Sequence, residues 1–255
     1  MGFHHLDQYA ETEVSGLMPV APAARVLGTV AIALAAAVLP AGAWPELLLV
    51  VVLVVVLSRL ARVPLATLLR RASVPLAFLA LAGAGLLVLS PGNPVAGFGP
   101  FTVTDGGLTR VGSALLRGGA AIGAGVLLVS TTRFPDLVEG LRELRLPAVV
   151  TASIGLAYRF LYLLMDEVAQ LQRAAASRNA GGGRVARRRL MMGITASALT
   201  RSFARSERVH RAMLARGYTG ALPSLHPHPL DARSLGGLLL LTIFLAAVVA
   251  AARLG

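Results

Sequence analysis

The chain has 255 residues, of which 56% are hydrophobic and only 14% are charged, whereas a typical soluble domain has about 25% charged residues. Its formal net charge is +12, and it contains no cysteine, which excludes disulfides, thiolate metal sites and cysteine nucleophiles. Aromatic residues make up only 5% and offer few surfaces for stacking bases, so the apolar background favours a membrane protein with positively charged loops over a nucleic-acid-binding protein.

The apolar segments predict five membrane-spanning helices, because a span needs about 20 predominantly apolar residues. In chain order, the predicted spans cover residues 26–43, 47–57, 72–90, 111–131 and 235–252. A tight turn at residues 40–46 separates the first two spans, and Trp44 suits an interfacial position there. Pro75 lies near the start of the third span, where proline costs little. A loop rich in glycine and proline, residues 91–109, follows that span.

The arginines predict the orientation of these spans. The segment between the second and third spans carries Arg59, Arg62, Arg70 and Arg71, whereas the segments expected on the other side of the membrane carry almost none. Positively charged loops stay in the cytoplasm. We therefore expect the N-terminus and residues 132–234 to be cytoplasmic and the C-terminus to be external.

The chain divides into three parts by these criteria: the N-terminal segment with four spans, a central region, and a loop with the last span. They cover residues 1–131, 132–220 and 221–255, respectively. The central region begins with a short amphipathic helix predicted over residues 132–146, in which Pro135 suits the first turn.

Two long helices follow in the central region, over residues 148–178 and 185–216, with three consecutive glycines between them. The segment 148–165 is apolar apart from Arg159, which is compatible with a sixth span or with a partly embedded helix. The sequence thus predicts an all-α polytopic membrane protein with about five spans and a cytoplasmic pair of long helices.

The two long helices end alike, with a small residue, an arginine and a residue that tolerates left-handed geometry. These residues are Ser177, Arg178 and Asn179 in the first helix and Ala215, Arg216 and Gly217 in the second. Such ends are typical of ordinary helix C-caps, where an arginine also complements the helix dipole. Two copies on adjacent long helices favour a second interpretation, in which each arginine enters an acidic groove on another protein.

The chain resembles the transmembrane T component of energy-coupling factor (ECF) transporters, in particular the cobalt-type CbiQ family. The resemblance covers nearly the whole chain and includes the segments 5–10, 132–147 and 158–167. The second helix end, residues 215–217, matches the family's small–Arg–Gly coupling motif fully. The first end keeps Arg178 but replaces both of its neighbours.

This resemblance implies a subunit without an ATPase of its own, in the plasma membrane of a prokaryote. The subunit would join a substrate-binding membrane (S) subunit to two cytoplasmic ABC ATPases. The two long helices would be coupling helices, and their terminal arginines would dock in grooves on the ATPases. Cobalt is the substrate implied by the CbiQ resemblance, although nickel systems use a very similar T component.

Charged residues in apolar segments are further candidates. Arg117 lies inside the fourth predicted span, where a charge is usually functional, with snorkelling towards the outer interface as an equal alternative. Arg159, Asp166 and Glu167 are predicted to be architectural. Spacings of seven and eight residues put Arg159 two helical turns from the acids, so we expect ion-pair partners on the crossing helix.

No set of residues predicts catalysis, a metal site or a cofactor. The chain has no lysine for a phosphate-binding loop, and it has neither a GxSxG nor an HExxH motif. His4 and His5 are adjacent, but the resemblance assigns ion binding to the S subunit, and the same holds for His226 and His228. We expect a non-enzymatic subunit, with a stand-alone channel or carrier as the less favoured alternative.

The bilayer itself is an expected partner. Arginines cluster at residues 184–189, where they suit anionic lipid headgroups or hold the connecting loop on the cytoplasmic side.

Overall fold

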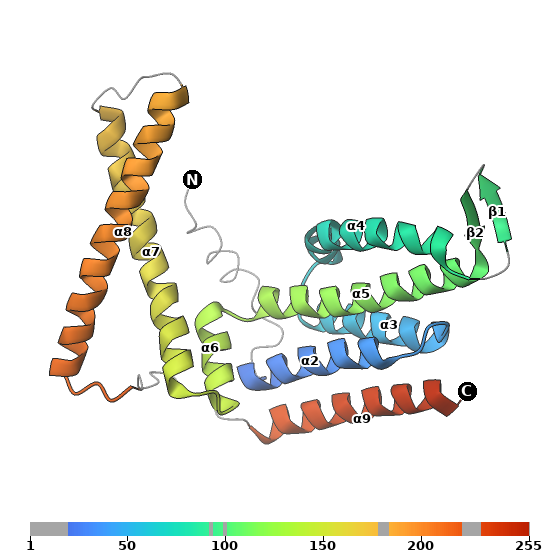
Figure 1. Cartoon of the computed structure of the whole chain (residues 1–255). Coiled ribbons are helices and arrows are strands. Elements are labelled where there is room, and N and C mark those ends of the chain that lie inside the picture. Colours follow the sequence, from blue (N-terminus) through green and yellow to red (C-terminus); the bar gives the residue numbers. More distant parts are fainter. Residues whose placement is uncertain (1–19, 92–93, 99–100, 178–183, 221–230, 255) are drawn as a thin grey trace. The chain divides into compact units, whose positions relative to one another are not determined.

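The computed structural model (Figure 1) describes residues 20–91, 94–98, 101–177, 184–220 and 231–254. They belong to two compact units, one of residues 1–144 with 227–255 and one of residues 145–226. The elements are α2 (Pro22–Val38), α3 (Trp44–Leu60), α4 (Leu65–Leu89), β1 (Pro94–Phe98), β2 (Phe101–Thr104), α5 (Asp105–Thr131), α6 (Phe134–Glu143), α7 (Ala148–Ser177), α8 (Arg184–Ala215) and α9 (Ala232–Leu254). The predicted helical membrane fold is confirmed, with one short β-ribbon as the exception.

Four segments of the described chain are long and apolar enough to cross a bilayer. They are Leu65–Gly85, Asp105–Thr131, Ala148–Ser177 and Ala232–Arg253. Helices α2 and α3, which correspond to the first two predicted spans, have only 17 residues each. That length is about 25 Å, less than the roughly 30 Å of a hydrocarbon core. The segment 148–165, which the sequence left open, belongs to the continuous 30-residue helix α7.

The third predicted span begins earlier than the sequence indicated. The link between α3 and α4 is only residues 61–64, because the chain reverses at Arg62, whose φ of 57° is left-handed. Arg70 and Arg71 therefore lie within α4 and not in a loop. Pro75, expected near the start of the span, lies in the helix interior, where it removes one backbone hydrogen bond.

The loop expected over residues 91–109 contains the antiparallel ribbon β1–β2 and the first turn of α5. Thr104 caps this helix. Its Oγ1 accepts a hydrogen bond from the Gly107 amide (3.2 Å) and donates one to the Ser90 carbonyl (2.8 Å). With Asp105 in the first turn, which favours the positive end of the helix dipole, α5 begins six residues before the predicted span.

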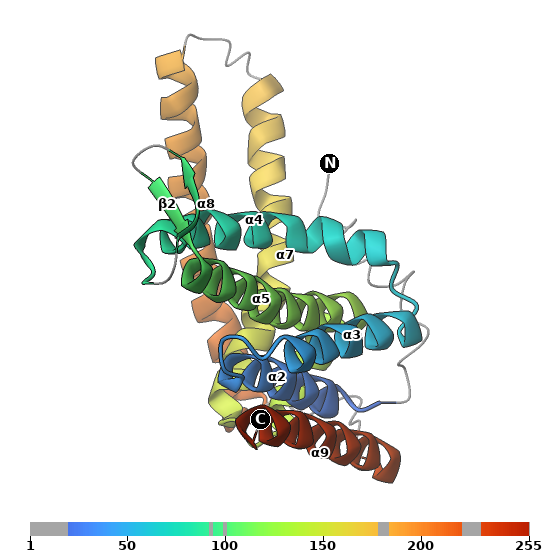
Figure 2. The same ribbon diagram turned by 90° about the vertical axis from the view of Figure 1, so that its right-hand side faces the viewer.

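Helices α2, α3, α5 and α9 share the main hydrophobic core of the first unit. Its buried residues are Ile32, Ala35, Ala36, Leu39, Leu47, Val50, Val54, Ala120, Ala124, Leu245 and Val248. Helix α5 also packs against α4, and α9 packs against α2 and α3 (Figures 1 and 2). Gly118 allows α4 and α5 to approach closely, because a Cβ there would overlap the Leu79 side chain.

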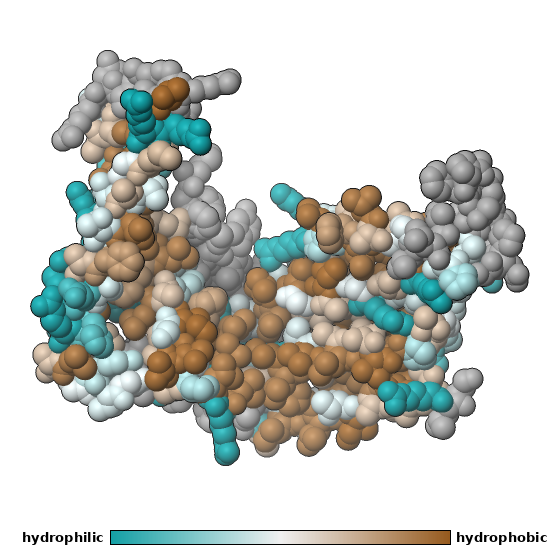
Figure 3. Space-filling model, in the orientation of Figure 1, coloured by the Kyte–Doolittle hydropathy of each residue, from teal (hydrophilic) through white to brown (hydrophobic). Residues whose placement is uncertain are grey.

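Large apolar side chains remain on the outside of these helices. Phe78 of α4 is 74% exposed and Leu240 of α9 is 72% exposed. Apolar surface covers much of the visible face of the first unit (Figure 3). In water such a surface would be an aggregation hazard, whereas in a bilayer it faces lipid of the same polarity.

The predicted amphipathic helix after the fourth span is confirmed as α6, with Pro135 in its first turn. It packs against the start of α2, backbone against backbone. A Cβ at Gly140 would lie 2.8 Å from the Ala23 nitrogen and 2.9 Å from the Pro22 carbonyl carbon. Helix α6 groups with the first unit, whose first segment ends at Leu144; the division predicted after residue 131 stays a prediction.

We expect Gly140→Ala to destabilise the chain by about 1–3 kcal/mol, the usual cost of overpacking, because the nearest atoms are backbone atoms that cannot rotate away. Gly125→Ala in α5 is the matched control, since no atom lies within 4 Å of a Cβ there. Thermal unfolding of the detergent-solubilised variants measures the difference. Equal midpoints for the two variants would contradict the proposed tight contact between α6 and α2.

The second unit is a helical hairpin, which we call the α7–α8 hairpin. Helix α7 has 30 residues and α8 has 32. The two helices run antiparallel and cross each other (Figures 1 and 2). Their lengths of about 45 Å put the C-terminal end of α7 and the C-terminal end of α8 at opposite ends of the hairpin.

Candidate functional site

The C-terminal end of α8 is a complete Schellman cap. Gly217 adopts a φ of 82°, the left-handed conformation that glycine adopts without strain. Its amide donates to the Leu214 carbonyl (3.0 Å), and the Tyr218 amide donates to the Met213 carbonyl (3.0 Å). The predicted C-cap is therefore confirmed at this end of the hairpin.

This cap fixes the position of Arg216 while leaving its side chain available. The Arg216 amide donates to the carbonyls of Ala212 (3.2 Å) and Met213 (3.0 Å), so its backbone is held by the last turn of α8. Ala215, Arg216 and Gly217 are all exposed. The geometry supplies a rigid helix end with a forked cationic donor, which suits both the capping and the docking interpretations.

At the C-terminal end of α7 the structure describes Ser177 but not the residues that follow. Ser177 is the last helical residue; it is exposed, and its Oγ donates to the Ala174 carbonyl (2.9 Å). Arg178 and Asn179 lie outside the described residues. Their docking role stays a prediction, carried by the motif and by the matched end of α8.

A buried carboxylate connects the two helices of the hairpin. Glu167 of α7 is only 8% exposed. Its Oε1 lies 3.6 Å from Nη1 of Arg201, and its Oε2 lies 3.3 Å from Nη2 of Arg205. The contact between Glu167 and Arg205 is an ion pair by distance, but its angles are not those of a hydrogen bond. For Glu167, the expected partner on the crossing helix is confirmed.

The sequence missed Arg201 and Arg205 as the two partners. Both lie on the face of α8 that also carries the buried Ile194 and Ala198, at spacings of four, three and four residues. Such spacings follow one stripe of a helix. The pairing could have been predicted from this pattern, in which two arginines four residues apart continue an apolar face of the helix.

The neighbouring candidates are not part of this contact. Asp166 and Arg159 are exposed on α7, and neither forms an ion pair with any described residue. Adjacent residues on a helix point about 100° apart, so burying Glu167 turns Asp166 outward. Of the three residues predicted to be architectural, only Glu167 forms an ion pair with a described residue; the architectural role itself stays a prediction.

Arg117 lies near the middle of the 27-residue helix α5, about 18 Å from its start. It is half-buried, and its Nε has no hydrogen-bond partner among the described residues. The sequence placed Arg117 closer to the start of the span, because it placed that start six residues too late. The extra helical turns make it harder for the side chain to reach the end of α5.

Arg25 joins α2 to the end of α5, a connection that the sequence did not predict. The first span was expected to begin one residue later, at residue 26. The Arg25 Nη1 donates to the Thr131 carbonyl (2.6 Å) and to Thr132 Oγ1 (3.4 Å) at the end of α5. Nearby, the Ala21 amide donates to the buried Oγ of Ser234 in α9 (2.9 Å). These bonds tie together the starts of α2 and α9 and the end of α5.

The described residues contain no group of three or more histidine, aspartate or glutamate side chains placed to hold a metal ion. His4, His5, His226 and His228 lie outside the described part of the chain. The site that the described residues build consists of a helix pair, the ion pairs of Glu167 between the helices and an exposed arginine at one end.

These features define a multi-pass helical membrane protein with a pair of long helices that form a unit of their own. A profile of the CbiQ family, described as cobalt transport protein, matches residues 17–228. The chain belongs to this family, which provides a membrane component of transporters, so the resemblance seen in the sequence is confirmed.

Individual relatives agree with this assignment. The cobalt transport protein CbiQ of Rhodobacter capsulatus is 31% identical over 219 residues, 84% of this chain and 85% of that protein. The energy-coupling factor transporter transmembrane protein EcfT of Brevibacillus brevis is 32% identical over 136 residues, 49% of this chain and 51% of that protein. CbiQ of Salmonella typhimurium is 32% identical over 82 residues, 31% of this chain and 36% of that protein.

Proposed function

We propose that this chain is the T subunit of an ECF-type importer for cobalt ions. It would receive the motion of two cytoplasmic ABC ATPases and transmit it to a substrate-binding membrane subunit. Two named relatives support this proposal, one as a cobalt transport protein and one as a transmembrane protein of an energy-coupling factor transporter. The N-terminus and residues 132–234 would face the cytoplasm of a prokaryotic cell, as the arginine distribution indicates.

The α7–α8 hairpin is the observation that carries the proposal. Its helices have 30 and 32 residues and run antiparallel, so Ser177 at the end of α7 and Arg216 at the end of α8 lie at opposite ends of the hairpin, too far apart for one groove. Two separated arginine ends suit two ATPase subunits, each receiving one end. When the ATPases close on ATP, the ends would be drawn together and the helices would pivot at their crossing, a rigid-body transition between two packings.

The ion pairs of Glu167 support this mechanical role. A pivot transmits force only if the helices stay joined where they cross, and a buried carboxylate between two arginines is costly to separate. The side chains of Arg201 and Arg205 are 61% and 36% exposed, respectively, so both arginines stay in contact with water. The two ion pairs can therefore shift during a pivot without stranding a dry, unpaired arginine. The ions themselves would be selected by the substrate-binding subunit, so the choice between cobalt and nickel would not reside in this chain.

The test is ATP-driven ion uptake by proteoliposomes. The chain is co-expressed with ATPase and S subunits of an ECF cobalt importer, and labelled Co²⁺ and Ni²⁺ are offered separately. We expect uptake that requires ATP and all subunits. Liposomes holding this chain alone should take up neither ion above the level of empty liposomes. Ion uptake by the chain alone would support the stand-alone carrier and overturn the proposal.

A further inference from the structure

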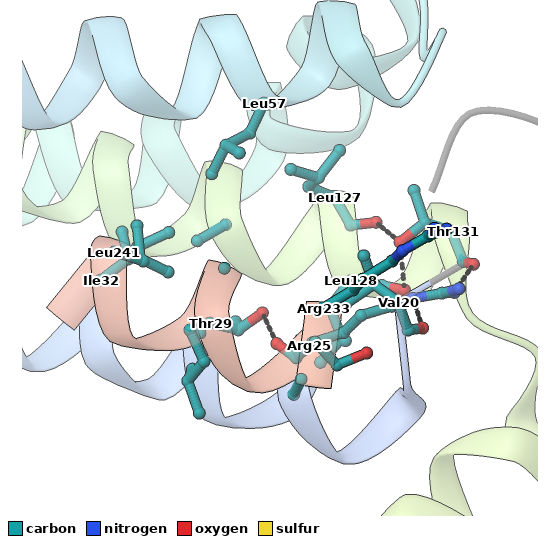
Figure 4. Close-up of a pocket in the computed structure, with 16 residues that line it drawn as sticks. Val20, Arg25, Thr29, Ile32, Leu57, Leu127, Leu128, Thr131, Arg233 and Leu241 are labelled. Carbon is teal, nitrogen blue, oxygen red and sulfur yellow. Dashed lines mark hydrogen bonds between the residues drawn. The ribbon is translucent and has the colours of Figure 1, made fainter. Parts of the chain in front are cut away.

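The first unit contains a partly open cavity of about 210 Å³ between α2, α3, α5 and α9 (Figure 4). Most of the residues that line it are apolar, among them Ile32, Leu57, Leu127 and Leu241. Gly237 of α9 also lines it and is exposed, so the cavity reaches the protein surface there. The volume is below the roughly 300–1,000 Å³ of pockets that enclose a whole small molecule; it suits a segment of one hydrocarbon chain.

Positive charge gathers at one end of this cavity. Arg25 and Arg233 lie at the same end, and Ile32 and Leu241 lie at the other (Figure 4). The 16 residues that line the cavity include these two arginines and no acid. An apolar groove with a cationic mouth is complementary to an amphiphile with an anionic head.

The two arginines differ in how they are held. Arg25 is partly buried and is fixed by its bonds to the end of α5, where the opposite charge of Asp136 of α6 also acts on it. Arg233 is exposed and forms no ion pair with a described residue, Asp231 included. Its place in the first turn of α9 is unfavourable by itself, because that end of a helix carries partial positive charge. An anionic ligand would remove this repulsion.

We propose that this cavity binds a phospholipid with a net negative headgroup. The headgroup phosphate would accept hydrogen bonds from Arg233, and the first part of one acyl chain would enter the cavity between α2 and α9. The rest of this acyl chain would lie on exposed apolar side chains of α9, which include Leu239 (59% exposed). Basic pockets between membrane helices are known to select anionic lipids in this way.

Phospholipid binding to the full-length chain in detergent, measured by native mass spectrometry, tests the proposal. Phosphatidylglycerol is compared with phosphatidylethanolamine, which has a similar shape and no net charge. We expect the unmodified chain to retain phosphatidylglycerol preferentially. Arg233→Gln should weaken its binding about tenfold, whereas Arg253→Gln at the other end of α9 should leave binding unchanged.

A second pair of variants tests the hydrocarbon part. Gly237→Leu places a side chain at the cavity, while Gly236→Leu changes a neighbouring glycine that does not line it; neither Cβ meets an atom within 4 Å. We expect Gly237→Leu to weaken the binding of both lipids and Gly236→Leu to weaken neither. The proposal is wrong if Arg233→Gln and Arg253→Gln retain phosphatidylglycerol equally, or if Gly237→Leu has no effect. Either outcome would be expected if the natural occupant of the cavity is a segment of a partner protein and not a lipid.

Discussion

The double variant Arg178→Glu/Arg216→Glu is expected to insert into the membrane normally but to lose at least 100-fold in ATPase association. Charged anchors at protein interfaces each contribute about 2–4 kcal/mol when truncated, and 1.4 kcal/mol corresponds to a tenfold change in binding. Reversing both charges removes two such anchors and adds repulsion from the acidic grooves that we propose. ATP-driven ion uptake should fall to the level of empty liposomes.

The structure indicates why the fold should survive this change. The cap of α8 is made by backbone groups of Gly217 and Tyr218, and the Arg216 side chain is exposed. A glutamate at a helix C-terminus costs only about 0.3–1 kcal/mol through the helix dipole. The neutral double variant with glutamine at both positions avoids even that cost, and we expect it to lose at least tenfold in association.

The matched control is Arg188→Glu/Arg208→Glu. These arginines are exposed on α8 and form no ion pair with a described residue, and their replacement changes the net charge by the same amount. Co-purification of the ATPases with tagged chain measures association for each variant. If the ATPases co-purify as well with the Arg178/Arg216 variant as with this control, the arginine ends are C-caps and nothing more.

The second large effect is expected for Glu167→Lys, which should open the α7–α8 hairpin. The lysine would place a third positive charge between Arg201 and Arg205, at a position that is 8% exposed. Glu167→Gln keeps the shape and removes only the charge. We expect it to cost about 1–2 kcal/mol, because both arginines are partly solvated and lose less than fully buried partners would.

Because the chain has no cysteine, spin labels can be attached at introduced cysteines without background. Gln170 and Ser206 are exposed on α7 and α8, respectively, and suit such labels. Electron–electron distance measurements should give one narrow distribution for the parent chain and a broad one for Glu167→Lys. Asp166→Lys, at the exposed neighbouring position, should leave the distribution narrow. Broadening by Asp166→Lys to the same extent would show that any added charge loosens the hairpin.

Local patterns account for what the sequence predicted well. Leucine- and valine-rich stretches are apolar wherever they lie, so the helical membrane class was predictable. Helix α6 was predictable from its helical spacing of leucines, and the two long helices were predictable from the glycines between them. The cap at Gly217 was predictable because left-handed geometry after a helix depends on one residue and its immediate neighbours. The predicted ends of the spans were less accurate. The cap of α5 depends on Thr104 and on the Ser90 carbonyl, which is 14 residues away.

The sequence by itself determined the class of this protein, its excess of positive charge and the arginines at the ends of its long helices, because composition, hydropathy and cap chemistry are properties of short segments. Only the tertiary structure decided that Glu167, and not Asp166, joins the hairpin, and that Arg25 ties α2 to the end of α5. It also decided that Gly140 sits against the backbone of α2. These three results depend on which residues of separate helices become neighbours, and the periodicity of one helix does not contain that information.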